Sequence, residues 1–289
     1  AYATNLDDLL AFEELINKFS NTKETLPFCF TAVSYVPEDK LDCSHANDEA
    51  IKCKAVYWAD NKNVHDKDKS ARYLAVLLPH GGANVNLGIM YLDRDDNVDV
   101  LSHELSHLLG FVDEYPLPKA HGKCEENQQE PFSHNIMVLN SSYQGKQKEI
   151  RQALLKEIPW AKYILPTTPI LTSQGVINDI EYWALGTTEK YANNVGVFPA
   201  RTCENQMTTA FKPLRLTTQL EYFEAPFPTL YKSMVQKNIE QFLMPSFHYN
   251  IAQAYFEQGR LKLSKDWLKK SAARENDPHR AQKILTGSF

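Results

Sequence analysis

The sequence predicts an α+β fold with a helical C-terminal segment, and three observations support this prediction. Apolar residues recur at helical spacing near the N-terminus and around residue 100, and apolar runs that end at proline suggest strands between them. From about residue 229 the pattern is helical throughout. The 289 residues suffice for one large domain or two modest ones. We therefore expect an α+β domain over residues 1–228 and a helical segment over residues 229–289.

The first sixty residues are expected to form one helix and two strands. Residues 5–20 carry apolar side chains at helical spacing and predict an amphipathic helix. Phe28–Val36 is rich in β-branched and aromatic residues and ends at Pro37, which favours a strand. Lys54–Ala59 is a weaker strand candidate, and Asn61–Ser70 is a charged stretch expected to form a loop.

Two more strands are predicted before residue 97. Arg72–Leu78 is an apolar run closed by Pro79, which indicates a buried strand, and Gly81–Gly82 then turns the chain. Gly88–Leu92 is a short strand candidate that ends at the turn residues Asp93–Asp96.

Helices are predicted on both sides of an irregular stretch. Val98–Leu109 has the apolar spacing of a helix, and Gly110 is a typical residue to end it. Residues 114–145 contain several prolines and are expected to be irregular. Lys146–Ile158 predicts another helix, and a loop rich in Thr and Pro is expected to follow as far as Gly175.

The helical C-terminal segment resembles a single tetratricopeptide repeat over residues 245–278. Its packing positions are Ala252, Tyr255, Gly259, Ser264, Leu268, Ala272 and Pro278. One copy cannot bury its own apolar face, so it must pack on the body of the protein. We weigh two roles for it, a helical hairpin that caps the fold and a surface that binds a protein partner.

Charge and hydropathy exclude several classes of protein. The net charge of −5 and a pI near 6.0 give no indication of nucleic-acid binding, and no Lys/Arg cluster suggests an anionic membrane surface. The apolar runs, such as Tyr73–Leu78, are far too short to span a bilayer. We therefore expect neither nucleic acid nor a transmembrane segment.

The cysteines and the first residue favour a secreted or periplasmic protein. The chain starts with Ala1 rather than Met, as expected after removal of a signal peptide or for a segment of a longer gene product. None of the five cysteines forms a CxxC pair, which argues against a cysteine zinc site. Cys43 and Cys53 bracket a short polar loop and are expected to form a disulfide. The alternative is free thiols in a cytosolic protein.

The strongest chemical signal is the HExxH sequence at residues 103–107, inside a predicted helix. Residues four apart lie on one face of a helix, so His103 and His107 can bind one zinc ion at about 2 Å. Glu104 can take a proton from the water that the metal acidifies and pass it to the leaving amine. By composition such a match arises in about one chain in a hundred of this length, so the alternative is a surface helix without a metal. The remaining histidines considered are expected to be surface or structural residues: His80, His121, His134 and His248.

A third ligand is expected shortly after the helix. Gly110 can adopt the left-handed conformation that turns the chain back, which brings a residue three positions on beneath the metal. That residue is Asp113, and a carboxylate oxygen is a good zinc ligand. Glu114 is the alternative, since a change of one residue in the turn would present it instead. Three protein ligands and a water would make an open catalytic site.

The run HExxHxxGxxD followed by Glu-Tyr resembles the metzincin-like bacterial metallopeptidases named after an IgA-cleaving peptidase. The resemblance covers roughly residues 70–210, and its specific part is the zinc helix. Its further motifs are the strand Tyr73–Leu78 before Gly81–Gly82, Glu130-Pro131-Phe132, Asn135-Ile136, Trp160–Pro169, and Gly196-Val197-Phe198-Pro199 with Cys203 and Met207. The arginine that precedes the proline in that family is absent, because Phe198 stands there.

The resemblance implies a zincin-like fold with a twisted mixed sheet, a backing helix and the zinc helix. It also implies a methionine in a tight turn beneath the metal, where a soft side chain packs against the histidines. Met207 is the candidate by its position and Met137 is the other, and the alternative for either is an ordinary core methionine.

These residues predict a zinc-dependent metalloendopeptidase acting on peptides or proteins, with Glu104 as the general base. The alternative is a zinc-containing interaction module whose helical tail binds a partner and whose metal site is vestigial or regulatory. A zinc hydrolase of non-peptide amides would use the same chemistry. Gly88–Leu92 is expected to be either a simple sheet edge or the edge that pairs with an extended substrate.

Overall fold

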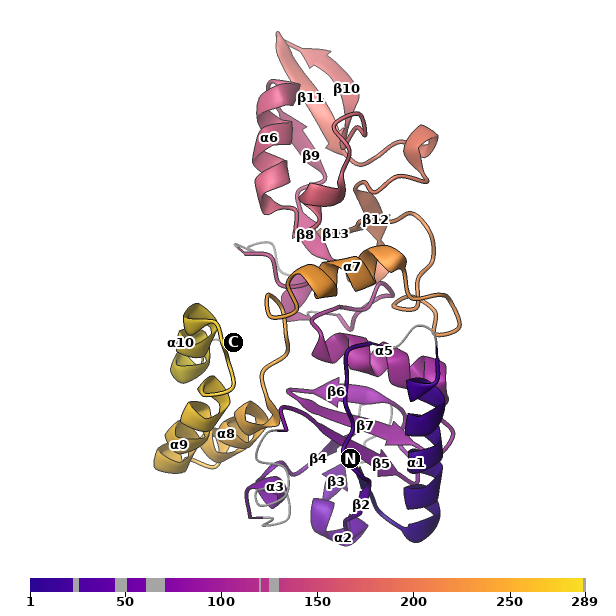
Figure 1. Cartoon of the computed structure of the whole chain (residues 1–289). Coiled ribbons are helices and arrows are strands. Elements are labelled where there is room, and N and C mark those ends of the chain that lie inside the picture. Colours follow the sequence, from indigo (N-terminus) through magenta and orange to yellow (C-terminus); the bar gives the residue numbers. More distant parts are fainter. Residues whose placement is uncertain (23–25, 45–50, 61–70, 120, 125–129, 288–289) are drawn as a thin grey trace. The chain divides into compact units, whose positions relative to one another are not determined.

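The computed structural model describes residues 1–22, 26–44, 51–60, 71–119, 121–124 and 130–287. The fold is mixed α+β with a helical C-terminal region, as expected (Figure 1). The chain forms two compact units, one comprising Ala1–Leu109 with Leu243–Phe289 and the other Gly110–Phe242. These units do not coincide with the expected segments 1–228 and 229–289, because the last three helices pack with the N-terminal part of the chain.

A five-stranded mixed sheet is the centre of the first unit. Its strand order is β2-β1-β5-β7-β6, in which β6 alone runs antiparallel to its neighbour. The strands are β1 (Tyr2–Ala3), β2 (Ser34–Tyr35), β5 (Leu74–Leu78), β6 (Asn84–Asn86) and β7 (Ile89–Asp93). The predicted strands at Arg72–Leu78 and Gly88–Leu92 are confirmed.

Both faces of this sheet are covered by helices. Every residue of β5 is buried, as expected for a parallel strand covered on both sides. Alternate residues Leu74, Val76 and Leu78 pack in one cluster with Phe247 of α8. The intervening side chains point to the opposite face, where α1 (Leu6–Ser20) and α5 (Val98–Leu108) contact each other and the strands (Figure 1).

Of two predicted strands near the N-terminus, one is confirmed only in part and the other is wrong. Within Phe28–Val36 only Ser34–Tyr35 forms a strand. Lys54–Ala59 lies mainly in a short helix, α3 (Val56–Asp60), because this conformation buries Trp58 completely against the sheet cluster. A helix α2 (Glu38–Leu41) and the paired strands β3 (Cys43–Ser44) and β4 (Lys52–Cys53) precede it. The predicted loop Asn61–Ser70 lies outside the described residues.

The position of β7 contradicts the prediction of an edge strand at Gly88–Leu92. β7 pairs with β5 on one side and with β6 on the other, so among the described strands β6 forms this edge of the sheet. A two-residue turn at Leu87 and Gly88, with φ of 44° and 84°, folds β6 back along β7. Two consecutive residues with positive φ make the turn that suits the twist of a hairpin.

The C-terminal helices cap the sheet of the first unit. They are α8 (Phe247–Glu257), α9 (Leu261–Ala272) and α10 (Pro278–Thr286). α8 and α9 pack as a hairpin, and Ile251, Ala252 and Tyr255 of α8 enter the sheet cluster. The expectation that the single repeat packs on the body of the protein is thereby confirmed. Arg72 also ties the two parts together, since its guanidinium donates to the Arg274 carbonyl at 2.6 Å and pairs with Glu275.

The second unit contains two three-stranded antiparallel sheets. One has the order β12-β13-β8 and the other β10-β11-β9. The elements are β8 (Met137–Leu139), β9 (Ser142–Gln144), α6 (Gln147–Glu157), β10 (Leu171–Ile177), β11 (Ile180–Leu185), β12 (Phe198–Ala200), β13 (Thr209–Lys212) and α7 (Thr229–Lys237), with 3₁₀ turns η1 (Gly122–Cys124), η2 (Ala161–Tyr163), η3 (Glu189–Tyr191) and η4 (Arg201–Cys203). The predicted helix Lys146–Ile158 is confirmed. The stretch 114–145 is less irregular than expected, and the loop predicted as far as Gly175 already becomes a strand at Leu171.

Candidate metal centre

Helix α5 has a defined start and a fixed end. The side chain of Asn97 caps the helix by accepting from the backbone N–H groups of Asp99 at 2.8 Å and Val100 at 3.1 Å. At the other end the carbonyl of Leu108 accepts from the Tyr73 hydroxyl at 3.1 Å. Burial raises the pKa of Tyr73 to about 12, so this hydroxyl keeps its proton at neutral pH. This hydrogen bond joins the residue before strand β5 to the C-terminal end of helix α5.

His103, Glu104 and His107 form a cluster on this helix that can hold a metal ion. One ligand atom from each lies within 4.8 Å of the others. The Nε2 atoms of His103 and His107 are 3.0 Å apart. Two nitrogens that share a tetrahedral zinc ion at about 2.05 Å are separated by about 3.3 Å, so the imidazoles need to move only a few tenths of an ångström. The donor set therefore can hold a metal ion.

The three side chains of the cluster differ in exposure. His103 is 1% exposed and Glu104 is 4% exposed, whereas His107 is partly exposed. A buried carboxylate one residue after a buried imidazole is costly unless a partner balances its charge. A divalent cation held by the cluster would add such a balancing charge.

Gly110 ends the helix in a way that only glycine permits. Its φ is +91°, in the left-handed region. A Cβ atom at this position would lie 2.1 Å from the carbonyl oxygen of Phe242. Both constraints confirm that the chain turns at Gly110, as the sequence predicts.

The carboxylate of Glu114 accepts hydrogen bonds from four groups of the second unit and has a structural role there. Its Oε1 accepts from the Tyr231 hydroxyl at 2.5 Å and from the Asn135 amide at 3.1 Å. Its Oε2 accepts from the Lys212 ammonium at 2.8 Å and from the Thr218 hydroxyl at 2.9 Å. Two acceptor oxygens with four donors have no capacity left for a metal ion.

The electrostatics of this network keep its donors protonated. Burial lowers the pKa of Lys212, but the carboxylates of Glu114 and Glu221 more than offset this effect, so the pKa is raised. Burial, and then the charge of Glu114, raise the pKa of Tyr231 well above its ordinary value. The network therefore stays intact at neutral pH. Nothing in the sequence motif marks Lys212 or Tyr231 as partners of Glu114, because they follow it by about a hundred residues.

Asp113 lies in the second unit, whereas the two histidines lie in the first. Its backbone carbonyl accepts from the Thr202 hydroxyl at 2.7 Å, and its side chain is partly exposed. The assignment of Asp113 to the same ion as the histidines accordingly rests on its spacing from Gly110 along the chain.

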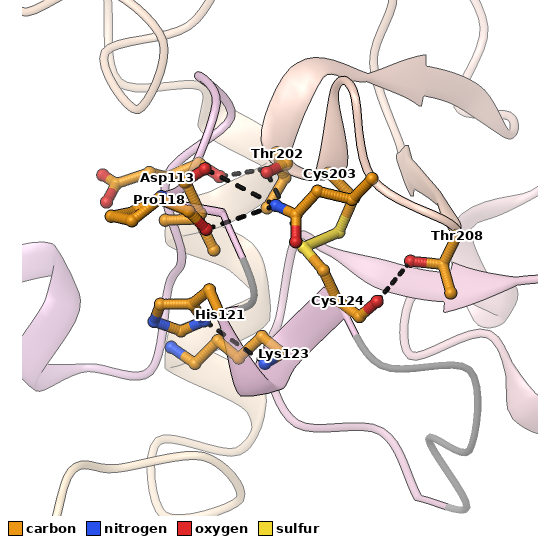
Figure 2. Close-up of a disulfide and its surroundings, with 10 residues drawn as sticks. Asp113, Pro118, His121, Lys123, Cys124, Thr202, Cys203 and Thr208 are labelled. Carbon is orange, nitrogen blue, oxygen red and sulfur yellow. Dashed lines mark hydrogen bonds between the residues drawn. A yellow bond between two sulfur atoms is a disulfide. The ribbon is translucent and has the colours of Figure 1, made fainter.

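Two disulfides are present among the described residues. Cys43–Cys53 was expected from the sequence and is confirmed. Cys124–Cys203 joins η1 to η4 and was not predicted, since two cysteines separated by 79 residues give no local signal (Figure 2). Cys29 is free and exposed.

The methionine and histidine candidates outside the cluster have different environments. Met207 is 87% exposed, which does not fit a methionine that packs tightly beneath a metal site. Met137 is buried in the second unit. His134 and His248 are buried among aromatic rings and are structural, whereas His80 is exposed.

Comparison with family models, with curated proteins and with solved structures found no match for this chain. The candidate site therefore stands on its own geometry. None of the described helices has both the length and the hydrophobicity needed to cross a bilayer.

Proposed function

We propose that this protein is a zinc-dependent metalloendopeptidase in which His103, His107 and Asp113 hold the metal and Glu104 is the general base. One observation carries the proposal. The two Nε2 atoms lie 3.0 Å apart on one helix with the buried carboxylate of Glu104 between them in sequence. A purely structural metal site has no use for that carboxylate.

The expected roles of the metal ion and of Glu104 follow from their chemistry. A bound zinc ion supplies a Lewis acid that acidifies water and polarises the carbonyl of the substrate. Glu104 accepts a proton from the attacking water and delivers it to the amine that leaves. Its 4% exposure keeps bulk water away from the carboxylate during this transfer.

Asp113 is the better choice of third ligand because Glu114 is already saturated. The carboxylate of Glu114 accepts four hydrogen bonds within the second unit. Withdrawing it to bind zinc would leave Lys212 with only Glu221 as an ion-pair partner. Breaking a buried ion pair costs about 3–5 kcal/mol, which favours the neighbouring residue.

The sheet of the first unit supports a zincin-like interpretation of the fold. It is mixed, and its antiparallel edge strand β6 leads directly into β7 and the helix with the two histidines. Among the described strands β6 pairs only with β7, so its outer backbone groups can pair with an extended peptide. The substrate-pairing role considered for Gly88–Leu92 is therefore proposed for Asn84–Asn86 instead.

Two disulfides within one chain also support a secreted or periplasmic protein. An oxidising compartment would keep both bonds formed, whereas cytosolic reductants would oppose them.

The test combines metal content with peptide hydrolysis. Purified protein is loaded with zinc, freed of excess metal and given a mixed peptide library, and products are identified by mass spectrometry. We expect cleavage that a chelator stops and zinc restores. Glu104→Ala should keep zinc but lose hydrolysis, whereas His103→Ala should lose zinc. His80→Ala, which changes an exposed histidine outside the cluster, is the matched control and should behave as wild type.

Near-normal turnover in purified Glu104→Ala would refute the mechanism. Wild-type protein that binds zinc but cleaves no member of the library would instead favour a metal-containing interaction module.

A further inference from the structure

We propose that the outer side of helix α9 binds the surface of an anionic lipid bilayer, with Phe256 and Leu261 inserting between the lipid headgroups. We call Lys262, Lys265 and Lys269 the basic face of α9. All of these residues belong to the first unit. The inference is independent of the proposed function, because it concerns where the protein is held and not which bond it cuts.

The charge of the C-terminal helices is opposite in sign to that of the whole chain. Arg or Lys occupies eight positions of residues 257–289 and Asp or Glu occupies four, although the chain has a net charge of −5. Helix α9 alone carries four lysines and one aspartate. A local excess of positive charge in an acidic chain attracts a negatively charged partner.

Helical spacing gathers the lysines on one side of α9. Leu261, Lys265 and Lys269 are four residues apart and form one row along the helix, and Lys262 lies beside that row. All four side chains are exposed. Asp266 pairs with Lys269 at 3.7 Å, but both partners are exposed and such a pair is weak in water. In the sequence these lysines are separated by two or three other residues, so no run of basic residues indicated the face.

The packing of α9 holds the basic face outward. Trp267, Ser271 and Ala272 on the opposite side of the helix are buried, and Trp267 belongs to the apolar cluster of α8 and the sheet. α8 packs on the sheet and α9 packs on α8 (Figure 1). The lysines cannot turn inward without exposing Trp267, so the basic face meets a partner without a change in the fold.

Two large apolar side chains are exposed at the end of the same hairpin. Phe256 is 64% exposed and Leu261 is 54% exposed. A tight turn joins them, since Gly259 N–H donates to the Phe256 carbonyl and Arg260 N–H donates to the Tyr255 carbonyl, both at 2.9 Å. Basic residues together with exposed Phe and Leu are the composition of helices that lie in the membrane interface.

This combination favours a bilayer over a soluble acidic polypeptide. The acidic polypeptide would neutralise the lysines but offers no apolar layer for Phe256 and Leu261. A bilayer offers phosphate groups to the lysines and acyl chains to the two apolar side chains. Each lysine close to an anionic membrane strengthens binding by about fivefold, so the three lysines of the basic face together contribute about 100-fold.

The test is co-sedimentation of the full chain with lipid vesicles. The vesicles contain phosphatidylcholine alone or phosphatidylcholine mixed with phosphatidylglycerol. Binding is measured at about 0.1 M and about 1 M salt, because the Debye length falls from about 10 Å to about 3 Å between them. One variant changes all three lysines of the basic face to Gln, and a second combines Phe256→Ser with Leu261→Ser.

The matched control removes the same charge from another exposed surface. It changes three exposed lysines in and next to helix α6 of the second unit to Gln, namely Lys146, Lys148 and Lys156. Circular dichroism and thermal unfolding show that each variant is folded.

We expect wild type to bind the vesicles with phosphatidylglycerol at low salt and to lose most of that binding at high salt. The basic-face variant should have a partition coefficient about 100-fold lower. Phe256→Ser with Leu261→Ser should lower it by at least about tenfold, because two apolar side chains no longer leave water. The α6 variant should bind as wild type does.

Three results would overturn the inference. Wild type could fail to sediment with phosphatidylglycerol vesicles at low salt. The α6 variant could lose as much binding as the basic-face variant, which would make the net charge of the chain decisive instead of this face. Binding could also be unaffected by Phe256→Ser with Leu261→Ser, which would favour a soluble acidic partner. None of these measurements involves hydrolysis, so the proposed function is tested separately.

Discussion

We predict that Glu114→Gln lowers the free energy of unfolding by about 3 kcal/mol while zinc uptake by the folded protein is retained. The substitution keeps the size of the side chain but removes its charge. The amide oxygen can still accept from Tyr231 and Asn135. The amide nitrogen, however, is a donor that faces two other donors, Lys212 and Thr218.

The size of the expected loss in stability follows from the ion pair that Lys212 keeps with Glu221. Removing one partner of a buried ion pair costs about 3–5 kcal/mol. The Lys212 side chain is only 5% exposed, but it keeps Glu221 at 2.8 Å, so the loss should fall at the lower end. The pKa of Lys212 is raised on folding. Its ion pairs therefore contribute fully to the free energy of unfolding at every pH below the unfolded-state pKa of about 10.4. This contribution is lost only as the pH rises through the higher folded value, so the penalty should be equal at pH 6 and pH 9.

The assay is urea unfolding with hydrogen exchange by mass spectrometry, because the two compact units need not unfold together. Peptides from residues 110–242 report the unit that contains Glu114. Zinc is quantified in the same preparations. The matched control is Glu204→Gln, which removes an exposed partner of Arg201 and should change stability little.

The outcome that would refute this reasoning is specific. If Glu114→Gln binds no zinc and unfolds like wild type, Glu114 is the third ligand and the network does not hold it. Asp113→Asn should give the opposite pattern, with unchanged stability and a zinc affinity lowered by at least tenfold.

Three further predictions concern single positions. Gly110→Ala should destabilise by more than about 3 kcal/mol or prevent folding, since positive φ and the Phe242 carbonyl both exclude a Cβ; Gly122→Ala, which has open space, is the control for thermal unfolding. Burial raises the pKa of the Asp96 carboxyl to about 6 in the folded protein. Its ionisation therefore opposes folding above about pH 6 and has no effect on stability below the lower pKa that Asp96 has in the unfolded chain. Asp96→Asn should therefore add about 1 kcal/mol of stability at pH 7, after discounting for partial exposure, and nothing below pH 4; an equal effect at both pH values would contradict this. His107→Ala should abolish zinc binding measured by elemental analysis without changing the helix content seen by circular dichroism.

The elements that the sequence predicts correctly are those in which a local pattern decides the structure. α5 has an Asn cap, apolar spacing and a terminal glycine, and α6 and β5 are likewise defined by their own residues. The cluster of His103, Glu104 and His107 needs only helical spacing to form, so the sequence alone predicted it.

Two features that the sequence did not predict depend on partners far away in sequence, and a third, the edge of the sheet, depends on a local turn. Lys54–Ala59 became helical to bury Trp58 against the sheet. Among the described strands β6 rather than β7 lies at the edge of the sheet, because the turn at Leu87 and Gly88 folds β6 back along β7. The network around Glu114 joins residues from four separate segments, and no local rule indicates that they meet.

The return of the chain to the first unit at Leu243 has a consequence for synthesis on the ribosome. The apolar side of β5 is complete once residue 78 has emerged, but Phe247 and Ile251, which cover it, come only after the whole second unit has been translated. Until then the nascent sheet exposes an apolar surface that promotes aggregation or chaperone binding. Shortened versions of the protein that stop before α8 would keep that surface permanently and should accumulate as insoluble material.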